Sequence, residues 1–553
     1  MDINQSLKKP IKRLFELIEL ERTDINLLIV LTFGYGLLSI ATPIAVQALV
    51  NIVTMGGVLQ PLFVVSVILF ALLLLSGALY VFEGYVVELI QRRLFVRTSI
   101  NVAKNTQGID TAIYDHANPV ELMNRFFDVS TVQKSAATLL TVGLNAFLQG
   151  IIGSVILIFY SLYFGVIILI ALIFLTFIIF ILGNNGTDSA IDESKAKYTT
   201  AAWLETIARN FYIFKFFNGR DRAKSFTNQL ANTYLEKRNQ HFKILLYQNI
   251  AAVILYAVVG TSMLALGGAL VIQGQINLGQ FVAAELIIFG VLTAFVRFIS
   301  KLEYYYDMLA GLDKIGVLDD LPQEKLGQHE IEDQNLMSMA ANHISYHYSP
   351  RIKPINDVSF KLSKGESLAI LGESGTGKST LVRIITGLRL PTIGHIEFNN
   401  NDLRQLNQNS LRNLIGIASR VEIVEGSVID NIVLSRPNIT LGSVNVVLNE
   451  LGLLEDFSNL EHALDTPLTA FGAPLSTTQI QRLMLARAIV AKPSLLIIDG
   501  LLDSFTSKEL DAVLTLFNSH QSDWMLIVTT RFKHIAEKFG STLQLTQQQG
   551  GQK

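Results

Sequence analysis

The most constraining feature of this sequence is a series of long apolar runs within roughly its first 300 residues. A helix needs about 20 apolar residues to cross the hydrocarbon core of a bilayer. Six runs approach or reach that length: Leu27–Val50, Leu62–Phe82, Leu139–Tyr160, Phe164–Leu182, Ile250–Ile272 and Phe281–Phe298. A mean hydropathy of +0.41, with only 16% charged residues, is too apolar for an ordinary soluble protein of 553 residues. The runs predict six membrane-spanning helices.

Lysine and arginine are distributed unevenly among the connections between these runs. Asn51–Pro61, Ser161–Tyr163 and Gln273–Gln280 contain neither residue, whereas Glu83–Ala137 and Gly183–Tyr247 contain many, as does the N-terminal tail. Positively charged residues stay on the cytoplasmic side of a membrane. Both termini and the two long connections are therefore predicted to be cytoplasmic. Buried helices of a large soluble fold would not require this asymmetry.

The two long connections have helical periodicity next to the membrane, so we expect membrane helices that continue into the cytoplasm and return. Irregular tips are expected at Asp115–Pro119 and, less clearly, at Leu204–Asn210. Lys301–Val317 should continue the sixth membrane helix. The first run is not expected to be a cleaved signal peptide, because it is long, begins after 26 residues and is followed by no typical cleavage site.

Composition divides the chain into five parts. We expect an N-terminal cytoplasmic segment (1–26), a membrane domain (27–320), a polar linker (321–342), a soluble α/β domain (343–545) and a disordered tail (546–553). About 200 residues is a normal size for one soluble domain. The chain has no cysteine, so it has no disulfide framework, and its net charge of −2 gives no indication of nucleic-acid binding.

The soluble domain contains a phosphate-binding loop with the pattern G-x-x-x-x-G-K-[ST]. Its residues are Gly372, Glu373, Ser374, Gly375, Thr376, Gly377, Lys378, Ser379 and Thr380. An apolar strand at Ser367–Leu371 should precede the loop, and a helix at Leu381–Leu388 should follow it. Backbone N–H groups and the helix N-terminus can then hold the phosphates of a nucleotide. Lys378 would reach the β- and γ-phosphates, and Ser379 would bind Mg²⁺; a mere glycine-rich turn does not explain this Lys-Ser pair.

The order of these features resembles the ABC exporter family, and the resemblance covers essentially the whole chain. The membrane half most resembles the subgroup that exports proteins and peptides in bacterial type I secretion. The resemblance implies a multi-domain fold, in which an all-α six-helix transmembrane domain is followed by an α/β P-loop ABC nucleotide-binding domain that binds ATP and Mg²⁺. The N-terminal protease domain of some peptide exporters is not expected, because only 26 residues precede the first run.

Two strands of the soluble domain resemble nucleotide-binding strands of that family. Ile344–Tyr348 resembles the strand whose aromatic residue stacks on adenine, and we assign this role to Tyr348 rather than reading it as an ordinary half-buried tyrosine. Leu495–Asp499 resembles the second nucleotide strand, in which Asp499 would bind Mg²⁺ through water; the alternative is a buried strand that happens to end in Asp.

The segment Leu475–Gln479 reads L-S-T-T-Q and resembles the family signature L-S-G-G-Q. The resemblance implies that Ser476 and Gln479 contact a nucleotide held by the phosphate loop of a second subunit. Thr477 and Thr478 replace two glycines whose lack of a side chain lets the backbone approach the γ-phosphate.

Other positions that support hydrolysis in this family are also replaced. Gly500 follows Asp499, where the family has the Glu that acts as general base; Ser419 stands at the position of a Gln, and Thr530 at that of a His. We identify no intact catalytic residue, and expect retained ATP binding with lost hydrolysis. Loss of a general base typically costs about 10²–10⁴-fold in rate. The alternative is a working ATPase with unusual residues.

Three functions follow from the resemblance. The first is the degenerate half of a heterodimeric exporter, the second a slow homodimeric exporter, and the third a hydrolysis-deficient, ATP-binding scaffold or regulator of a secretion system. The expected partners are a second ABC half-transporter, the lipid bilayer and a periplasmic adaptor of a secretion system, with no nucleic acid, at the inner (cytoplasmic) membrane. Glu285, inside the sixth run, is either a substrate- or cation-binding group or a residue at a water-filled rim.

Overall fold

The computed structural model describes residues 10–54, 59–115, 119–325, 327–331, 335–348, 354–419 and 421–546. The chain divides into two compact units, Met1–Ile109 with His116–Gln323 and Asp110–Asp115 with Glu324–Lys553. Much of the expected N-terminal segment and nearly all of the expected tail, residues 1–9 and 547–553, lie outside the described residues.

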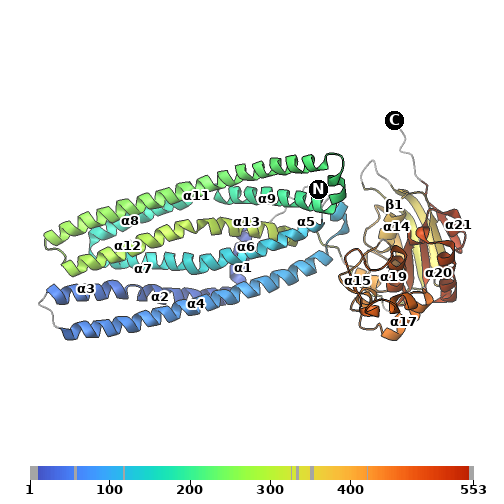
Figure 1. The fold of residues 1–553 in the computed structure, drawn as a ribbon, viewed down its shortest axis with the longest axis horizontal. Coiled ribbons are helices and arrows are strands. Elements are labelled where there is room, and N and C mark those ends of the chain that lie inside the picture. Colours follow the sequence, from blue (N-terminus) through green and yellow to red (C-terminus); the bar gives the residue numbers. More distant parts are fainter. Residues whose placement is uncertain are drawn as a thin grey trace. The chain divides into compact units, whose positions relative to one another are not determined.

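The first unit is helical throughout its described residues (Figure 1). Its helices are α1 (Pro10–Leu20), α2 (Arg22–Leu38), α3 (Ala41–Thr54), α4 (Leu59–Gln107), α5 (Pro119–Asn124), α6 (Asp128–Thr138), α7 (Leu144–Tyr160), α8 (Leu162–Phe177), α9 (Gly186–Arg209), α10 (Phe211–Lys215), α11 (Gly219–Ile272), α12 (Leu278–Ser300) and α13 (Leu302–Asp319). Short π-helical turns, Leu139–Gly143 and Ile178–Leu182, precede α7 and follow α8. Helix α12 packs against α7 and α11 to form the centre of the unit.

Among the described residues, six helical stretches are long and apolar enough to cross a membrane, and each contains one of the predicted runs. They are Arg22–Thr54, Leu59–Gln107, Leu122–Tyr160, Leu162–Leu182, Gly219–Ile272 and Leu278–Asp319. The prediction of an all-α domain with six spanning helices is confirmed, and the protein is a multi-pass membrane protein. Helices α4 and α11 have 49 and 54 residues, so each extends well beyond the bilayer, as predicted.

The prediction for the tip of the second long connection was wrong. Leu204–Asn210 was expected to be irregular, but α9 runs through Arg209, and the turn lies at Asn210 and in the short helix α10. Trp203 stabilises this arrangement, because its ring packs edge-on against Phe214 and Phe226. Residues 116–118 of the other predicted tip lie outside the described residues.

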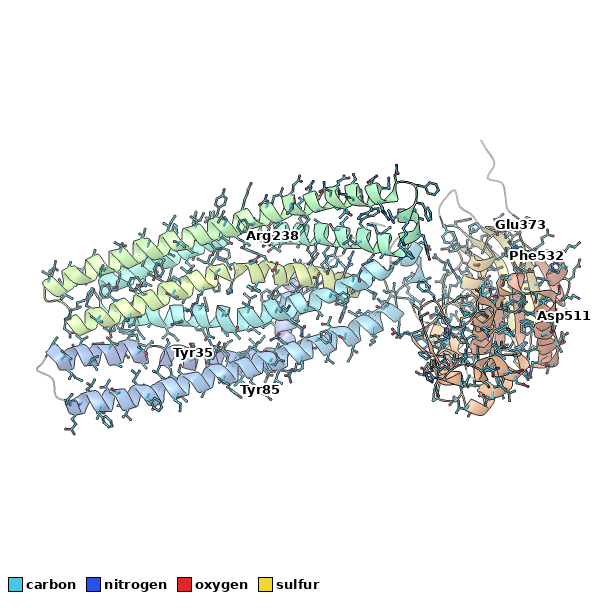
Figure 2. The ribbon with its side chains drawn as sticks, in the orientation of Figure 1. Tyr35, Tyr85, Arg238, Glu373, Asp511 and Phe532 are labelled. Atoms are coloured by element: carbon cyan, nitrogen blue, oxygen red, sulfur yellow. The ribbon has the colours of Figure 1, made fainter. Side chains whose placement is uncertain are left out.

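Ion pairs join three helices of the first unit away from the apolar runs. Arg238 on α11, labelled in Figure 2, lies 3.3 Å from a carboxylate oxygen of Glu193 on α9 and 3.1 Å from one of Glu303 on α13. The Arg238 side chain is 38% exposed, so solvent screens these pairs and they fix geometry more than they add stability.

The described residues of the second unit form three sheets. The strands are β1 (Ser338–Tyr346), β2 (Ile355–Ser363), β3 (Ser367–Leu371), β4 (Ile393–Phe398), β5 (Asn401–Asp402), β6 (Ile415–Ala418), β7 (Gly426–Ser427), β8 (Pro467–Leu468), β9 (Leu495–Asp499), β10 (Met525–Thr530) and β11 (Ser541–Gln544). A five-stranded parallel sheet has the order β11-β3-β10-β9-β6, an antiparallel sheet the order β2-β1-β4-β5, and β7 pairs with β8.

The central strands of the parallel sheet, β3, β9 and β10, are buried, whereas the edge strand β11 is largely exposed. The helices of this unit are α14 (Lys378–Ile385), α15 (Gln408–Asn413), α16 (Val428–Val433), α17 (Leu441–Glu450), α18 (Leu454–Ser458), α19 (Thr477–Ile489), α20 (Ser507–Ser519) and α21 (Lys533–Ala536). The continuous apolar sequences of β9 and β10 suit such strands. One face packs with Leu496 and Val528, the other with Leu495 and Ile527, into two separate apolar cores. The predicted α/β nucleotide-binding fold is confirmed.

Strand β1 begins at Ser338, inside the stretch 321–342 that was expected to be linker. Within that stretch, Met339 and Ala341 are buried in the core, whereas Ser338 and Asn342 are polar and only partly buried. A strand at the start of a domain that mixes small and polar residues is therefore easily mistaken for a linker in the sequence.

The topology yields a direct prediction. A cysteine at Gln275, which is exposed in the turn between α11 and α12, should react with a membrane-impermeant maleimide added to intact cells. A cysteine at Asp511, exposed on α20 and labelled in Figure 2, should react only after permeabilisation. The chain has no native cysteine, so each signal comes from one site. Labelling of position 511 but not 275 in intact cells would reverse the orientation.

Candidate nucleotide site

The phosphate loop connects β3 to α14, as predicted. Strand β3 covers Ser367–Leu371, but α14 begins at Lys378 and ends at Ile385, earlier than expected at both ends. The Lys378 ammonium donates hydrogen bonds to the carbonyl oxygens of Gly372, at 2.6 Å, and Glu373, at 2.8 Å. The positive charge is therefore held against the loop at the N-terminus of the helix, where an anion is favoured.

Two glycines are required by the geometry of the loop. Gly377 has a φ of +96°, and a Cβ there would lie 2.5 Å from the carbonyl oxygen of Pro354. A Cβ at Gly372 would lie 2.6 Å from the Thr376 hydroxyl, which itself donates to the Glu373 carbonyl. Because side chains are excluded, backbone N–H groups can approach a phosphate closely.

A cavity of about 980 Å³ opens beside the loop. From the predicted set it is lined by Tyr348, Ser374, Gly375, Gly377, Lys378, Ser379, Thr380, Ser419, Asp499 and Gly500. Gly372, Glu373, Thr376, Thr530, Ser476 and Gln479 are not part of its lining. The fold thus brings most of the predicted site together, from β1, the phosphate loop, β6 and β9.

The residues at this cavity fit a magnesium nucleotide. The Ser379 hydroxyl and the Asp499 carboxylate line the same space, and such oxygen ligands suit Mg²⁺, which keeps several waters of its own. One Asp499 carboxylate oxygen accepts a hydrogen bond of 2.6 Å from Thr529, which fixes its orientation. Bound Mg²⁺ would neutralise charge on the β- and γ-phosphates.

Tyr348 lies just after β1 and is 36% exposed. Its hydroxyl is 3.0 Å from the Thr380 hydroxyl on α14, and its ring contacts Tyr346 edge-on, with centroids 5.0 Å apart. A tyrosine that lines the cavity and is held at both its hydroxyl and its ring edge can offer a rigid surface to a base.

Gly500 lies directly after Asp499 in the left-handed region, with a φ of +72°. A Cβ at this position would meet no atom within 4 Å, so there is space for a larger residue. The obstacle is the left-handed backbone conformation, which non-glycine residues rarely adopt. Gly500 offers no group that could accept a proton from water. Ser419, immediately after β6, is half-buried and reaches less far than a glutamine would.

Thr530 is fully buried at the end of β10. Its hydroxyl donates to a carboxylate oxygen of Asp503 and accepts a hydrogen bond of 3.0 Å from the Phe532 N–H. The second oxygen of Asp503 accepts from the Arg531 N–H at 3.2 Å. The side chain at position 530 is thus engaged within the domain instead of facing the cavity.

Ser476 caps helix α19. Its hydroxyl accepts a hydrogen bond from the Gln479 N–H, and the Gln479 side-chain oxygen accepts from the Ser476 N–H at 2.9 Å. This reciprocal pair is a capping box, which Thr477 and Thr478 do not disturb. Both residues expected to contact a nucleotide in a second subunit therefore also stabilise the start of this helix.

The sequence analysis assigned no role to seven cavity residues that carry polar groups: Arg383, Glu422, Gln481, Asp503, Ser504, Thr529 and Arg531. Arg531 directly follows Thr530, so its place could have been inferred from the end of β10. Glu422 lies in the loop after β6, for which no motif specifies a position. The charged members of this group, two arginines and two carboxylates, add two positive and two negative charges to the wall of the cavity.

Comparison with known proteins identifies both units. Residues 25–295 match the family of ABC transporter transmembrane regions, and residues 355–502 match the ABC transporter family. A bacterial Atm1-family ABC exporter with ATP bound has the same fold, with a TM-score of 0.80 over 96% of this chain and 94% of that one, at 18% sequence identity.

Two curated bacterial relatives are named as transport or translocation ATP-binding proteins. The Mesentericin-Y105 transport/processing ATP-binding protein MesD of Leuconostoc mesenteroides is 25% identical over 86% of this chain and 66% of its own length. The Leukotoxin translocation ATP-binding protein LktB of Mannheimia glucosida is 30% identical over 42% of this chain and 33% of its own length. The match thus covers just under two thirds of the length of MesD and about a third of the length of LktB.

Proposed function

The chain belongs to the ABC transporter family, and on that premise we propose that it is one half of an exporter that binds ATP and uses pairing of nucleotide domains to move a substrate out of the cytoplasm. The observation that carries the proposal is the combination at one cavity: a phosphate loop with Lys378 and Ser379 in place, beside Gly500 where a general base would stand. MesD and LktB are named as transport or translocation proteins, which supports export as the activity.

We infer that this site binds Mg²⁺–ATP without turning it over at a useful rate. Lys378 and the loop N–H groups bind the phosphates, Ser379 and Asp499 hold Mg²⁺, and Tyr348 stacks on adenine. No group at position 500 takes the proton of an attacking water, and Thr530 is hydrogen-bonded to Asp503. Binding and hydrolysis rest on different residues, so one can be lost while the other is kept.

A second half-transporter completes the unit. This chain supplies one nucleotide domain and six spanning helices, and in the proposed pair Ser476 and Gln479 face ATP held by the partner. The tip of the second long connection carries an exposed apolar surface that the partner would cover. Its residues Phe211, Tyr212, Ile213, Phe216 and Phe217 are 44 to 99% exposed. Such an apolar patch on a polar segment marks an interaction site.

The proposed location is the inner membrane, with the nucleotide domain in the cytoplasm and a periplasmic adaptor of a secretion system as a further partner. The second candidate function is an ATP-binding scaffold or regulator of a secretion system. The fully buried Thr530, hydrogen-bonded to Asp503, supports this function as well as the first, because a site that holds ATP without hydrolysis also suits a regulatory subunit.

Purification from native membranes tests the proposed pair. The tagged chain should recover a second ABC half-transporter that carries Glu after the second nucleotide strand. Ile213→Asp, which puts a charge on the exposed tip, should lower that recovery about tenfold or more, since each 1.4 kcal/mol lost is tenfold in affinity. Val446→Asp on α17, an equally exposed apolar position at 58%, is the matched control and should change nothing. Recovery of only this chain would indicate a homodimer. If no second ABC subunit is recovered, and cells that lack this chain show no transport defect, the chain is a scaffold.

A further inference from the structure

A short segment of the first long connection belongs to the nucleotide-binding unit. Thr111–Asp115 forms a 3₁₀ turn and groups with residues 324–553 rather than with the helices on either side of it. The Thr111 hydroxyl donates to the Leu388 carbonyl, and a carboxylate oxygen of Asp115 lies 2.6 Å from the Arg389 guanidinium. The segment is thus attached by hydrogen bonds of Thr111 and by an ion pair of Asp115.

Arg389 is the centre of this attachment. Its side chain is only 4% exposed, and it donates to the Tyr346 hydroxyl at 2.8 Å and to the Thr111 carbonyl at 3.4 Å. Burial alone would lower the pKa of the guanidinium, but hydrogen bonds to Asp115 and Tyr346 raise it above its ordinary value. A buried arginine keeps its charge when it is paired in this way.

The same guanidinium lies over the ring of the proposed adenine-stacking residue. The central carbon of Arg389 is 5.1 Å from the Tyr348 ring centroid and 5.8 Å from that of Tyr346. A guanidinium over an aromatic face is attracted to it and restricts its movement. Tyr348 is further fixed by its hydroxyl contact with Thr380 and remains 36% exposed at the cavity.

We propose that Arg389 is a positioning residue that links attachment of the Thr111–Asp115 segment to the placement of Tyr348 against a nucleotide base. The proposal rests on the proposed nucleotide binding. With Asp115 in place, Arg389 is held over one face of Tyr348, and the opposite face is set for the base. When the segment detaches, the guanidinium loses its carboxylate and shifts, and the ring loses its support.

Two consequences follow from linkage. Attachment of the segment strengthens binding of the base, so a base on Tyr348 must strengthen attachment of the segment by the same factor. The effect is restricted to ligands with a base, because the phosphates are held by Lys378 and the loop, whereas the guanidinium of Arg389 donates its hydrogen bonds to Tyr346, Thr111 and Asp115. The connection from the membrane helices would then respond to the adenine end of ATP as well as to its phosphates.

The first experiment measures affinity of the full-length chain in lipid nanodiscs for Mg²⁺–ATP and for tripolyphosphate. Arg389→Ala and Asp115→Asn should each weaken ATP binding about fivefold or more, in line with typical coupling between sites, and leave tripolyphosphate binding unchanged. The double variant should lose no more than Arg389→Ala alone, because Asp115 acts through Arg389. Arg404→Ala, which breaks the more exposed Arg404–Asp402 pair in the same unit, is the matched control.

The second experiment measures attachment itself. A Thr111→Cys, Leu388→Cys pair should form a disulfide on mild oxidation, and the chain contains no other cysteine. ATP should raise its yield, tripolyphosphate should not, and Arg389→Ala should remove the effect of ATP. If Arg389→Ala fails to fold, Asp115→Asn provides the same test, because it keeps the shape of the segment.

Equal losses of ATP and tripolyphosphate affinity, unchanged ATP affinity in both variants, or a disulfide yield insensitive to ATP would each overturn the role of Arg389. Failure of the proposed nucleotide binding has a different result: ATP would not bind the unmodified chain at all, or would bind equally to Lys378→Ala.

Discussion

Purified without a partner, the chain should hydrolyse ATP at least about 100-fold more slowly than a subunit with a complete set of motifs, since a lost general base costs about 10²–10⁴-fold. Three positions contribute to the defect. Gly500 accepts no proton, Ser419 is short, and Thr530 is hydrogen-bonded to Asp503 within the domain. In the proposed pair, ATP at this chain's phosphate loop should stay bound through many cycles, while the other site turns over.

Steady-state ATPase of three preparations measures this: the chain alone, the pair, and the pair in which the partner's Glu after its second nucleotide strand is replaced by Gln. Of the three preparations, only the unmodified pair should hydrolyse ATP at a high rate. Gly500→Glu in this chain should add little, because a non-glycine residue at a φ of +72° strains the backbone and the other two positions stay unrepaired. Activity of the chain alone at the rate of a complete subunit, or a pair that keeps most activity without the partner's Glu, would contradict the expectation.

Lys378→Ala should abolish most nucleotide binding. The ammonium is held at the loop by the carbonyls of Gly372 and Glu373, and it would donate charge-assisted hydrogen bonds to the phosphates. Hydrogen bonds to charged groups contribute about 1.5–3 kcal/mol, so the affinity should fall about 10- to 100-fold. Labelling by a photoreactive ATP analogue, with and without Mg²⁺, measures the loss in the full-length chain.

Lys364→Ala serves as the control for this prediction, because Lys364 is an exposed lysine in the turn before β3, in the same unit but outside the cavity. Its labelling should equal that of the unmodified chain. Equal labelling of Lys378→Ala would mean that the loop no longer binds nucleotide, and the proposed function would lose its basis.

Much of the fold could be predicted because its signals are local. Apolar runs of membrane length give the six spanning helices, and a continuous apolar strand followed by G-x-x-x-x-G-K-S gives β3 and the loop. The second tip could not be placed as well. Helical periodicity does not show where α9 ends, and the turn after Asn210 depends on packing of Phe214 and Phe226 against Trp203.

The site was predicted as a set of positions, but not as a set of conformations. The replacement of Glu by Gly500 is visible in the sequence, whereas its left-handed backbone is not. The hydrogen bond that engages Thr530 joins residues 27 positions apart, and the Arg389–Asp115 pair joins residues 274 positions apart. Such partners are set by tertiary packing, which no local pattern records.

The ion pair between Asp115 and Arg389 also limits how this protein can be taken apart. A soluble fragment that begins at Glu324 would retain the guanidinium of Arg389 and leave its carboxylate partner behind, so the ion pair and the contacts of Thr111 would be lost together. Chimeras that exchange the C-terminal domain alone would inherit the same mismatch. The unit of exchange is therefore discontinuous in the gene: the C-terminal domain together with the Thr111–Asp115 turn.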